Sequence, residues 1–198
     1  MNKRRFILQP LILFLLFLLL AFVSERLFIN DNFQSLQIRN FQNEFIAKEK
    51  IATDVLNDLS GKLVNQDSIS DHTFYEKLKY LDNIFEKEEI TFLIFKNDNL
   101  IYWSDNITGT DYIDKKESNS LVKLPNSYNY FIEKNQADIS IQAFILIKYN
   151  YKIQNDFLEN NFAKSFNLPS SFLIAGEISE NSVPIRNQLG NTVFSIKH

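Results

Sequence analysis

Apolar residues fill the chain almost without interruption from 6 to 23, directly after the basic residues 3–5. A hydrocarbon core about 30 Å thick is crossed by a helix of roughly 20 mostly apolar residues, which the stretch 6–29 supplies. Basic residues mark the cytoplasmic end of such a helix. We therefore expect residues 1–30 to be a cytoplasmic start and a transmembrane helix in the inner (cytoplasmic) membrane, with the rest of the chain extracytoplasmic.

A cleaved signal peptide is the alternative interpretation of the same run. Cleavage requires two small residues separated by one position. Neither Ala21 with Val23 nor Phe22 with Ser24 provides such a pair. The sequence therefore favours an uncleaved single span.

The next segment, 31–63, has the period of a long helix. Its apolar residues recur three, four or seven positions apart, as on one face of a helix. They are Ile38, Phe41, Phe45, Ala52, Val55 and Leu59. This predicts a stalk helix whose stripe pairs with a second copy, giving a homodimer, or packs on its own domain.

From 64 onward the pattern predicts one further domain. A helix is expected over 71–85, and alternation from Ile90 then predicts a β-hairpin over 90–103. Further strands are expected at 128–133, 139–149, 172–178 and 192–197, with a helix at 155–166. This order predicts an α+β fold with an antiparallel sheet and flanking helices, resembling PAS-like sensor domains. Because 193–198 looks like a strand without a closing turn, we expect this domain, 64–198, to be truncated at its C-terminus.

Composition and charge exclude several classes of function. The chain has no cysteine, four glycines and a formal net charge of −3, which does not favour nucleic-acid binding. The histidines are His72, in a predicted helix start, and His198, the last residue, so neither is a supported general base. We expect no catalytic residues, no metal site and no cofactor in this chain.

The best candidates for ligand binding are consecutive residues at the end of the predicted hairpin. The chain's one tryptophan lies there beside a tyrosine, before three polar residues that can form hydrogen bonds with a ligand. The candidates are Tyr102, Trp103, Ser104, Asp105 and Asn106. The alternative is that the aromatic residues pack in the core while the polar ones only turn the chain. Tyr149 and Tyr151, at another strand end, are open to the same two interpretations.

Two segments carry a resemblance to a known family. Residues 94–106 read IFKNDNLIYWSDN, and residues 146–169 read LIKYNYKIQNDFLENNFAKSFNLP. Both resemble the extracytoplasmic sensor region of bacterial membrane-bound, often hybrid, sensor histidine kinases, over about 90–197. The resemblance implies an input region of a two-component system that passes a conformational change, induced by a small molecule or a protein, across the membrane.

The chain departs from that family in what it lacks. A second membrane helix, a phosphoaccepting histidine and a glycine-containing ATP-binding domain are absent, and Thr73 follows His72 where an acidic residue would stand. We therefore expect the chain itself not to be an enzyme, although its parent protein would be an ATP-dependent kinase. The alternative is a single-pass anchored protein of the cell envelope that binds another protein.

Overall fold

The computed structural model describes residues 3–63, 72–105, 117–175 and 182–197, with the backbone alone at 3–11, 24–33 and 72–74. Within these residues, no helix is long and apolar enough to cross a membrane. This finding overturns the predicted transmembrane helix and the predicted inner-membrane location.

Helix α1 is continuous over Lys3–Leu63, and its residues belong to two compact units, 1–39 and 40–198. In the first unit, the side chains from Ile12 to Val23 are exposed. In the second unit, α1 contributes buried core residues from Phe41 to Leu63. No separate stalk helix begins at 31. The predicted fold class, which joined a transmembrane helix, a stalk helix and a PAS-like sheet, is therefore wrong, and the second unit is instead an α+β fold that includes the end of α1.

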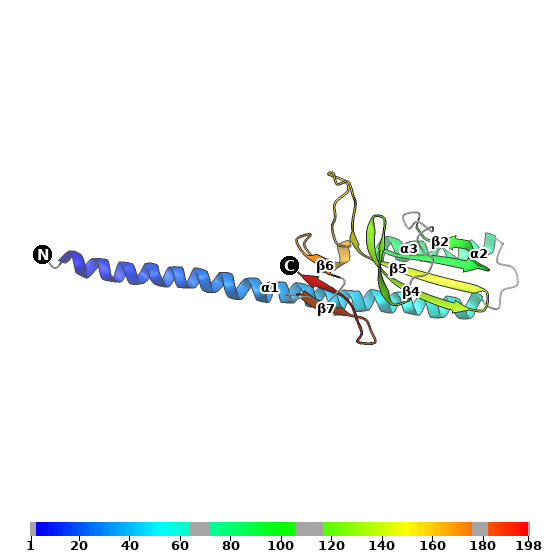
Figure 1. Cartoon of the computed structure of the whole chain (residues 1–198), viewed down its shortest axis with the longest axis horizontal. Helices are drawn as coiled ribbons and strands as arrows, with labels where there is room; N and C mark the ends of the chain where they lie inside the picture. The colour runs from blue at the N-terminus through cyan, green and yellow to red at the C-terminus, as the bar shows by residue number, and fades with distance from the viewer. Residues whose placement is uncertain (1–2, 64–71, 106–116, 176–181, 198) are drawn as a thin grey trace. The chain divides into compact units, whose positions relative to one another are not determined.

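The second unit contains two antiparallel sheets (Figure 1). The larger has the strand order β2-β1-β5-β4-β3, and the smaller has the order β6-β8-β7. The larger sheet is formed by β1 (Ile90–Lys96), β2 (Asn99–Trp103), β3 (Ser120–Leu124), β4 (Ser127–Gln136) and β5 (Ile139–Tyr149). The smaller is formed by β6 (Leu173–Ala175), β7 (Ser182–Arg186) and β8 (Thr192–Lys197). The short helices are α2 (His72–Leu78), α3 (Tyr80–Glu88) and the 3-10 turn η2 (Lys164–Phe166). The antiparallel pairing of β1 with β2 confirms the predicted hairpin.

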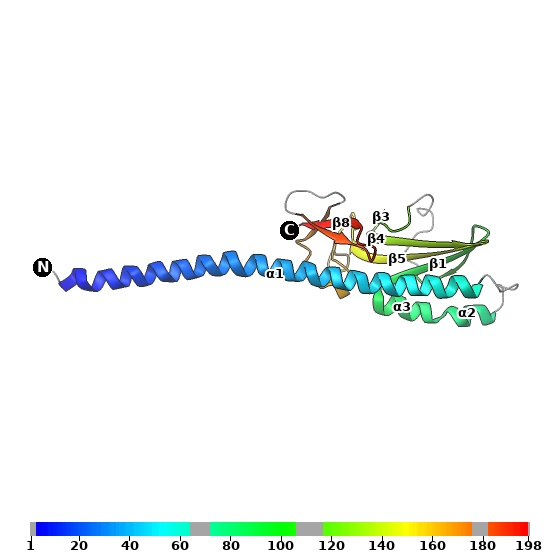
Figure 2. The ribbon, with the colours of Figure 1, turned by 90° about the horizontal axis from the view of Figure 1, so that it is seen from below.

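The second-unit part of α1 packs with its aromatic residues against both sheets. Figure 2 shows this part of α1 and α3 on the same face of the larger sheet. The Phe45 ring lies edge-on to Tyr130 of β4, with centroids 5.0 Å apart, and edge-on to Phe194 of β8, at 5.8 Å. One turn earlier, Phe41 stacks on Phe166 at 4.2 Å. The helix therefore joins the two sheets into one core.

Two buried charged residues of α1 add polar contacts to this packing. The Lys48 ammonium donates to the backbone carbonyl of Glu88 and lies 3.4 Å from a carboxylate oxygen of the same residue. The Glu49 carboxylate accepts hydrogen bonds from the Tyr130 hydroxyl, at 3.1 Å, and from the backbone N–H of Gln188, at 2.7 Å. Burial raises the pKa of Glu49, and these hydrogen bonds oppose that rise.

The opposite face of the larger sheet has its own apolar cluster. Because side chains alternate along a strand, Phe131 points away from the face on which Tyr130 meets α1. Phe131 packs there on Phe144 of β5, with ring centroids 5.0 Å apart. The remaining buried members of this cluster are Leu93, Val122 and Leu124.

The helix expected over 155–166 does not form. The Asn155 side-chain oxygen accepts hydrogen bonds from the backbone N–H groups of Phe157 and Leu158, both at 2.9 Å, which makes a tight turn in place of a helical one. Phe157 is 93 % exposed, whereas Phe166 is buried in the three-residue turn η2. The helical spacing of these apolar residues was therefore not a sign of one shared face.

Replacing Phe45 with alanine should destabilise the second unit as a whole. The substitution removes a fully buried ring that contacts both sheets, so the free energy of unfolding should fall by about 3–5 kcal/mol in urea denaturation. The exposed Leu189→Ala variant is the control, with an expected change within about 0.5 kcal/mol. A decrease in the free energy of unfolding of less than about 1 kcal/mol for Phe45→Ala would contradict the conclusion that α1 joins the two sheets into one core.

Candidate functional site

A cavity of about 230 Å³ opens where β1 begins and β5 ends. Strand alternation places Thr91 and Asn129 on the sheet face opposite α1, so the cavity lies beside the second apolar cluster. Its lining is part apolar and part polar. The lining residues are Phe85, Glu89, Thr91, Asp105, Leu124, Pro125, Asn126, Ser127, Asn129, Leu146, Tyr149 and Tyr151. We call it the acidic cavity, because its ionisable side chains are two carboxylates and two tyrosines.

Asp105 is the predicted site residue that lines this cavity. Its carboxylate accepts a hydrogen bond from the Thr91 hydroxyl, at 3.2 Å. The preceding residue, Ser104, holds the segment beside β1, because its backbone N–H donates to the Phe92 carbonyl at 3.0 Å while its hydroxyl accepts from the Phe92 N–H at 2.9 Å. Ser104 therefore positions Asp105 rather than lining the cavity itself.

The other predicted residues do not join Asp105. Tyr102 is buried, and its hydroxyl donates to a carboxylate oxygen of Asp82 at 2.6 Å and lies 3.2 Å from the carbonyl of Leu78, so it packs against the short helices. Burial and the nearby carboxylate raise the pKa of Tyr102 well above its ordinary value. Trp103 is half exposed and lies outside the cavity lining. Asn106 lies outside the described residues.

Two tyrosines form one wall of the acidic cavity. The rings of Tyr149 and Tyr151 stack with centroids 5.4 Å apart and planes 11° from parallel. The pKa of Tyr149 is raised by burial and by the negative charges of Glu89 and Asp105, with a contribution from Tyr151. Both carboxylates therefore disfavour the negatively charged form of the Tyr149 side chain.

Glu89 is the site residue that sequence reasoning missed. It ends α3 in the left-handed conformation, with φ 54°, and its backbone N–H donates to Phe85 O at 2.8 Å. Its own carbonyl accepts from the Leu146 N–H at 3.1 Å, which fixes this cap to β5. The side chain then reaches η2, where the Lys164 backbone N–H donates to it at 3.1 Å. A run of acidic residues at a helix end gave no signal that one of them would turn toward a cavity.

The lining of the acidic cavity combines polar and aromatic groups. Its lining contains carboxylates, hydroxyls, amides and aromatic rings, but no lysine, arginine or histidine. In the described part of the chain, no group of three or more acidic, histidine or cysteine side chains could hold a metal ion. Aromatic faces and carboxylates together attract a small organic cation.

Comparisons with known proteins found no match. No family model, no curated protein and no solved structure is similar to this chain.

Replacing Asp105 with asparagine should lower the pKa of Tyr149 from its raised value. The amide keeps an oxygen for the Thr91 hydroxyl but removes a negative charge that disfavours the tyrosinate. A spectrophotometric titration of tyrosinate formation measures the change. The titration step that is lost in a Tyr149→Phe variant identifies the signal of Tyr149. Asp98→Asn, in an exposed turn, is the matched control. An unchanged Tyr149 pKa would show that Asp105 does not act on the cavity.

Proposed function

We propose that this chain is the input region of a sensor histidine kinase, in which a small ligand bound in the acidic cavity changes the packing of the larger sheet on α1. The observation that carries the proposal is that residues lining the cavity are direct chain neighbours of residues that bind α1. This occurs at two separate places, β4 and the end of α3.

In β4, the neighbouring residues are Asn129 and Tyr130. Asn129 lines the cavity, and its side-chain amide donates to the Ser127 hydroxyl at 2.7 Å. Tyr130 points to the other face of the sheet and donates to Glu49 of α1. A ligand that moves the backbone at Asn129 therefore also moves the Tyr130 hydroxyl, which donates a hydrogen bond to Glu49.

At the end of α3, the neighbouring residues are Glu88 and Glu89. Glu89 lines the cavity, and Glu88 binds the buried ammonium of Lys48. Lys48 and Glu49 are adjacent on α1, so both routes from the cavity reach the same turn of the helix. This convergence supports a conformational mechanism, in which a ligand biases how the sheet sits on the helix.

The kinase class is supported by the sequence resemblance over about 90–197. The alternative is a protein of the cell envelope that binds another protein, and tests of ligand binding and of phosphorylation distinguish it from a sensor.

Ligand binding can be tested with phenethylamine, a small aromatic amine, and its neutral counterpart 2-phenylethanol. We expect phenethylamine to raise the Tm of the protein and 2-phenylethanol to have little effect. Asp105→Asn should weaken amine binding by about tenfold, since it removes one charge-assisted contact. Asp98→Asn should bind as the natural protein does. Equal binding of the amine and the alcohol would refute a cation-selective cavity.

The coupling to α1 can be tested by spin labels, because the chain has no native cysteine to remove. Labels at Ala47→Cys on α1 and Lys123→Cys on β3, both exposed, report the distance between helix and sheet. Phenethylamine should change this distance in the natural background. Tyr130→Phe, which removes the bond to Glu49, should abolish the change and leave binding intact, whereas Tyr128→Phe should alter neither.

The kinase assignment has its own test in the native polypeptide that carries this region. Incubated with ATP, it should take up phosphate in an acid-labile, histidine-linked form. A native polypeptide that takes up none is not a histidine kinase, even if the cavity binds amines, and the envelope-protein alternative would then stand.

A further inference from the structure

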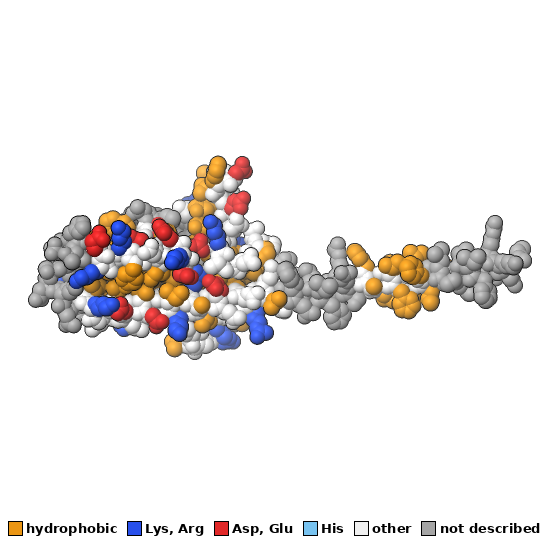
Figure 3. Space-filling view, turned by 180° about the vertical axis from the view of Figure 1, so that it is seen from behind, with side chains coloured by type: hydrophobic (Ala, Val, Ile, Leu, Met, Phe, Trp, Pro, Cys, Tyr) orange, Lys and Arg blue, Asp and Glu red, His pale blue; other side chains and the backbone are white. Residues whose placement is uncertain are grey.

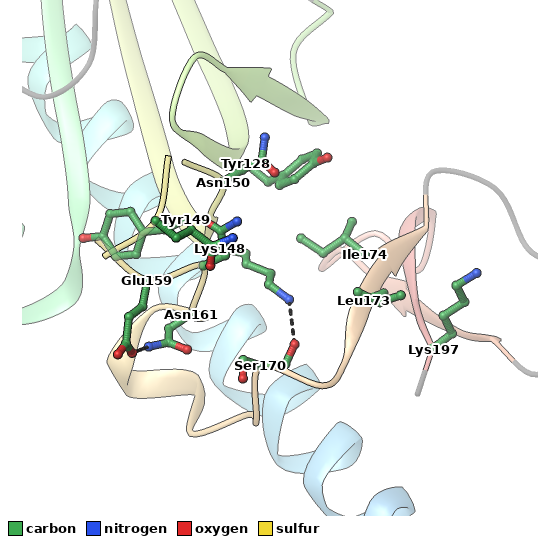
Figure 4. A pocket seen from close by; sticks show the side chains of 12 residues that line it. Tyr128, Lys148, Tyr149, Asn150, Glu159, Asn161, Ser170, Leu173, Ile174 and Lys197 are labelled. Carbon is green, nitrogen blue, oxygen red and sulfur yellow. Dashed lines mark hydrogen bonds between the residues drawn. The ribbon is translucent and has the colours of Figure 1, made fainter. Parts of the chain in front are cut away.

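A second, larger cleft of about 820 Å³ lies between the end of β5 and strand β6 (Figure 4). It borders the acidic cavity at Tyr149, which lines both. The Tyr149 ring points away from the β6 side of the cleft in Figure 4, and the side chain of Lys148 points into it. The facing wall is apolar, formed by Leu173 and Ile174 of β6. We call this the lysine cleft.

Lys148 is a buried cation held without a carboxylate. The residue is only 7 % exposed. Its ammonium donates hydrogen bonds to the backbone carbonyls of Phe172, at 2.6 Å, and Ser170, at 3.2 Å. The ammonium also lies 4.4 Å from the centre of the Phe162 ring. Within the described chain it forms no ion pair. Burial therefore lowers the pKa of Lys148 with no opposing charge to restore it.

The other deeply buried lysine of the chain shows the contrast. Lys48 has a carboxylate oxygen of Glu88 at 3.4 Å, as a buried charge usually requires. Carbonyl oxygens and a ring face orient the ammonium of Lys148, but they carry no net negative charge. Lys148 therefore lines the cleft with a positive charge that no described carboxylate balances.

The remaining charges of the lysine cleft leave it positive. Lys197 of β8 is its second cation, and no ion pair of Lys197 occurs among the described residues. The one carboxylate of the lining, Glu159, accepts a hydrogen bond from the Asn161 amide at 2.6 Å. Figure 4 places this pair on the side of the cleft away from β6. The net charge of the lining is therefore opposite in sign to that of the acidic cavity and of the whole chain.

We propose that the lysine cleft binds a small organic carboxylate, whose anionic group pairs with Lys148 and whose body lies between Tyr128 and the apolar wall of β6. Two lysines with no arginine in the lining suit a monoanionic carboxylate better than a phosphate dianion, which calls for several convergent donors. Asn150 supplies an amide for a polar group on the same ligand. This inference does not depend on the sensor role or on the acidic cavity.

Matched pairs of acid and amide test the proposal, because they differ in charge and hardly in shape. The probes are glucuronate with glucuronamide and 3-phenylpropionate with 3-phenylpropionamide, titrated into the whole chain by calorimetry. At least one acid should bind ten or more times tighter than its amide. If neither acid binds, or if acid and amide bind equally, the proposal is wrong.

Substitutions locate the bound anion. Lys148→Met should weaken binding of the acid at least tenfold, and Lys197→Met, at an exposed position, should weaken it severalfold without loss of fold. Lys77→Met, on the exposed side of α2 and outside the cleft, is the matched control and should bind normally. Should Lys148→Met fail to fold, Lys197→Met decides alone: unchanged acid binding in that variant overturns the site.

Discussion

The structure of the second unit depends on the contacts of one ring, that of Phe45. This ring meets Tyr130 of the larger sheet and Phe194 of the smaller sheet, and Phe41 reaches Phe194 and Phe166 one turn earlier. Both sheets bury aromatic side chains against α1, and burial of apolar surface is the main contribution to folding stability. Because both sheets use the same short length of α1, the helix cannot shift without changing the burial of aromatic residues in both.

The buried polar residues beside Phe45 make this packing specific. Apolar rings tolerate small rotations of a helix, whereas a buried ammonium or carboxylate that loses its partner is costly. Lys48 and Glu49 stand three and four positions after Phe45, on the same side of α1. Their partners lie in α3, β4 and the turn after β7, so three elements fix the rotation of one helix. A ligand that acts on any of these elements acts on the helix.

Local signals in the sequence were sufficient for some elements and insufficient for others. The hairpin of β1 and β2 and the long strands β4 and β5 follow from alternation and turn residues, whereas the short strands β3 and β7 were missed. The helix expected over 155–166 failed because Phe162 and Phe166 are buried by Phe41, a contact that local spacing does not encode. In the site, Asp105 was predicted from its place at a strand end, but Glu89 was not, since only its backbone conformation turns it toward the cavity.

The acidic cavity and the lysine cleft differ most in the sign of their charge. Tyr149 separates a cavity lined by Glu89 and Asp105 from a cleft lined by Lys148 and Lys197. A charged ligand that suits one site is repelled by the fixed charges of the other, so each site selects by exclusion as well as by attraction. Because Glu89 and Asp105 raise the pKa of Tyr149, a cation bound in the acidic cavity would oppose that rise.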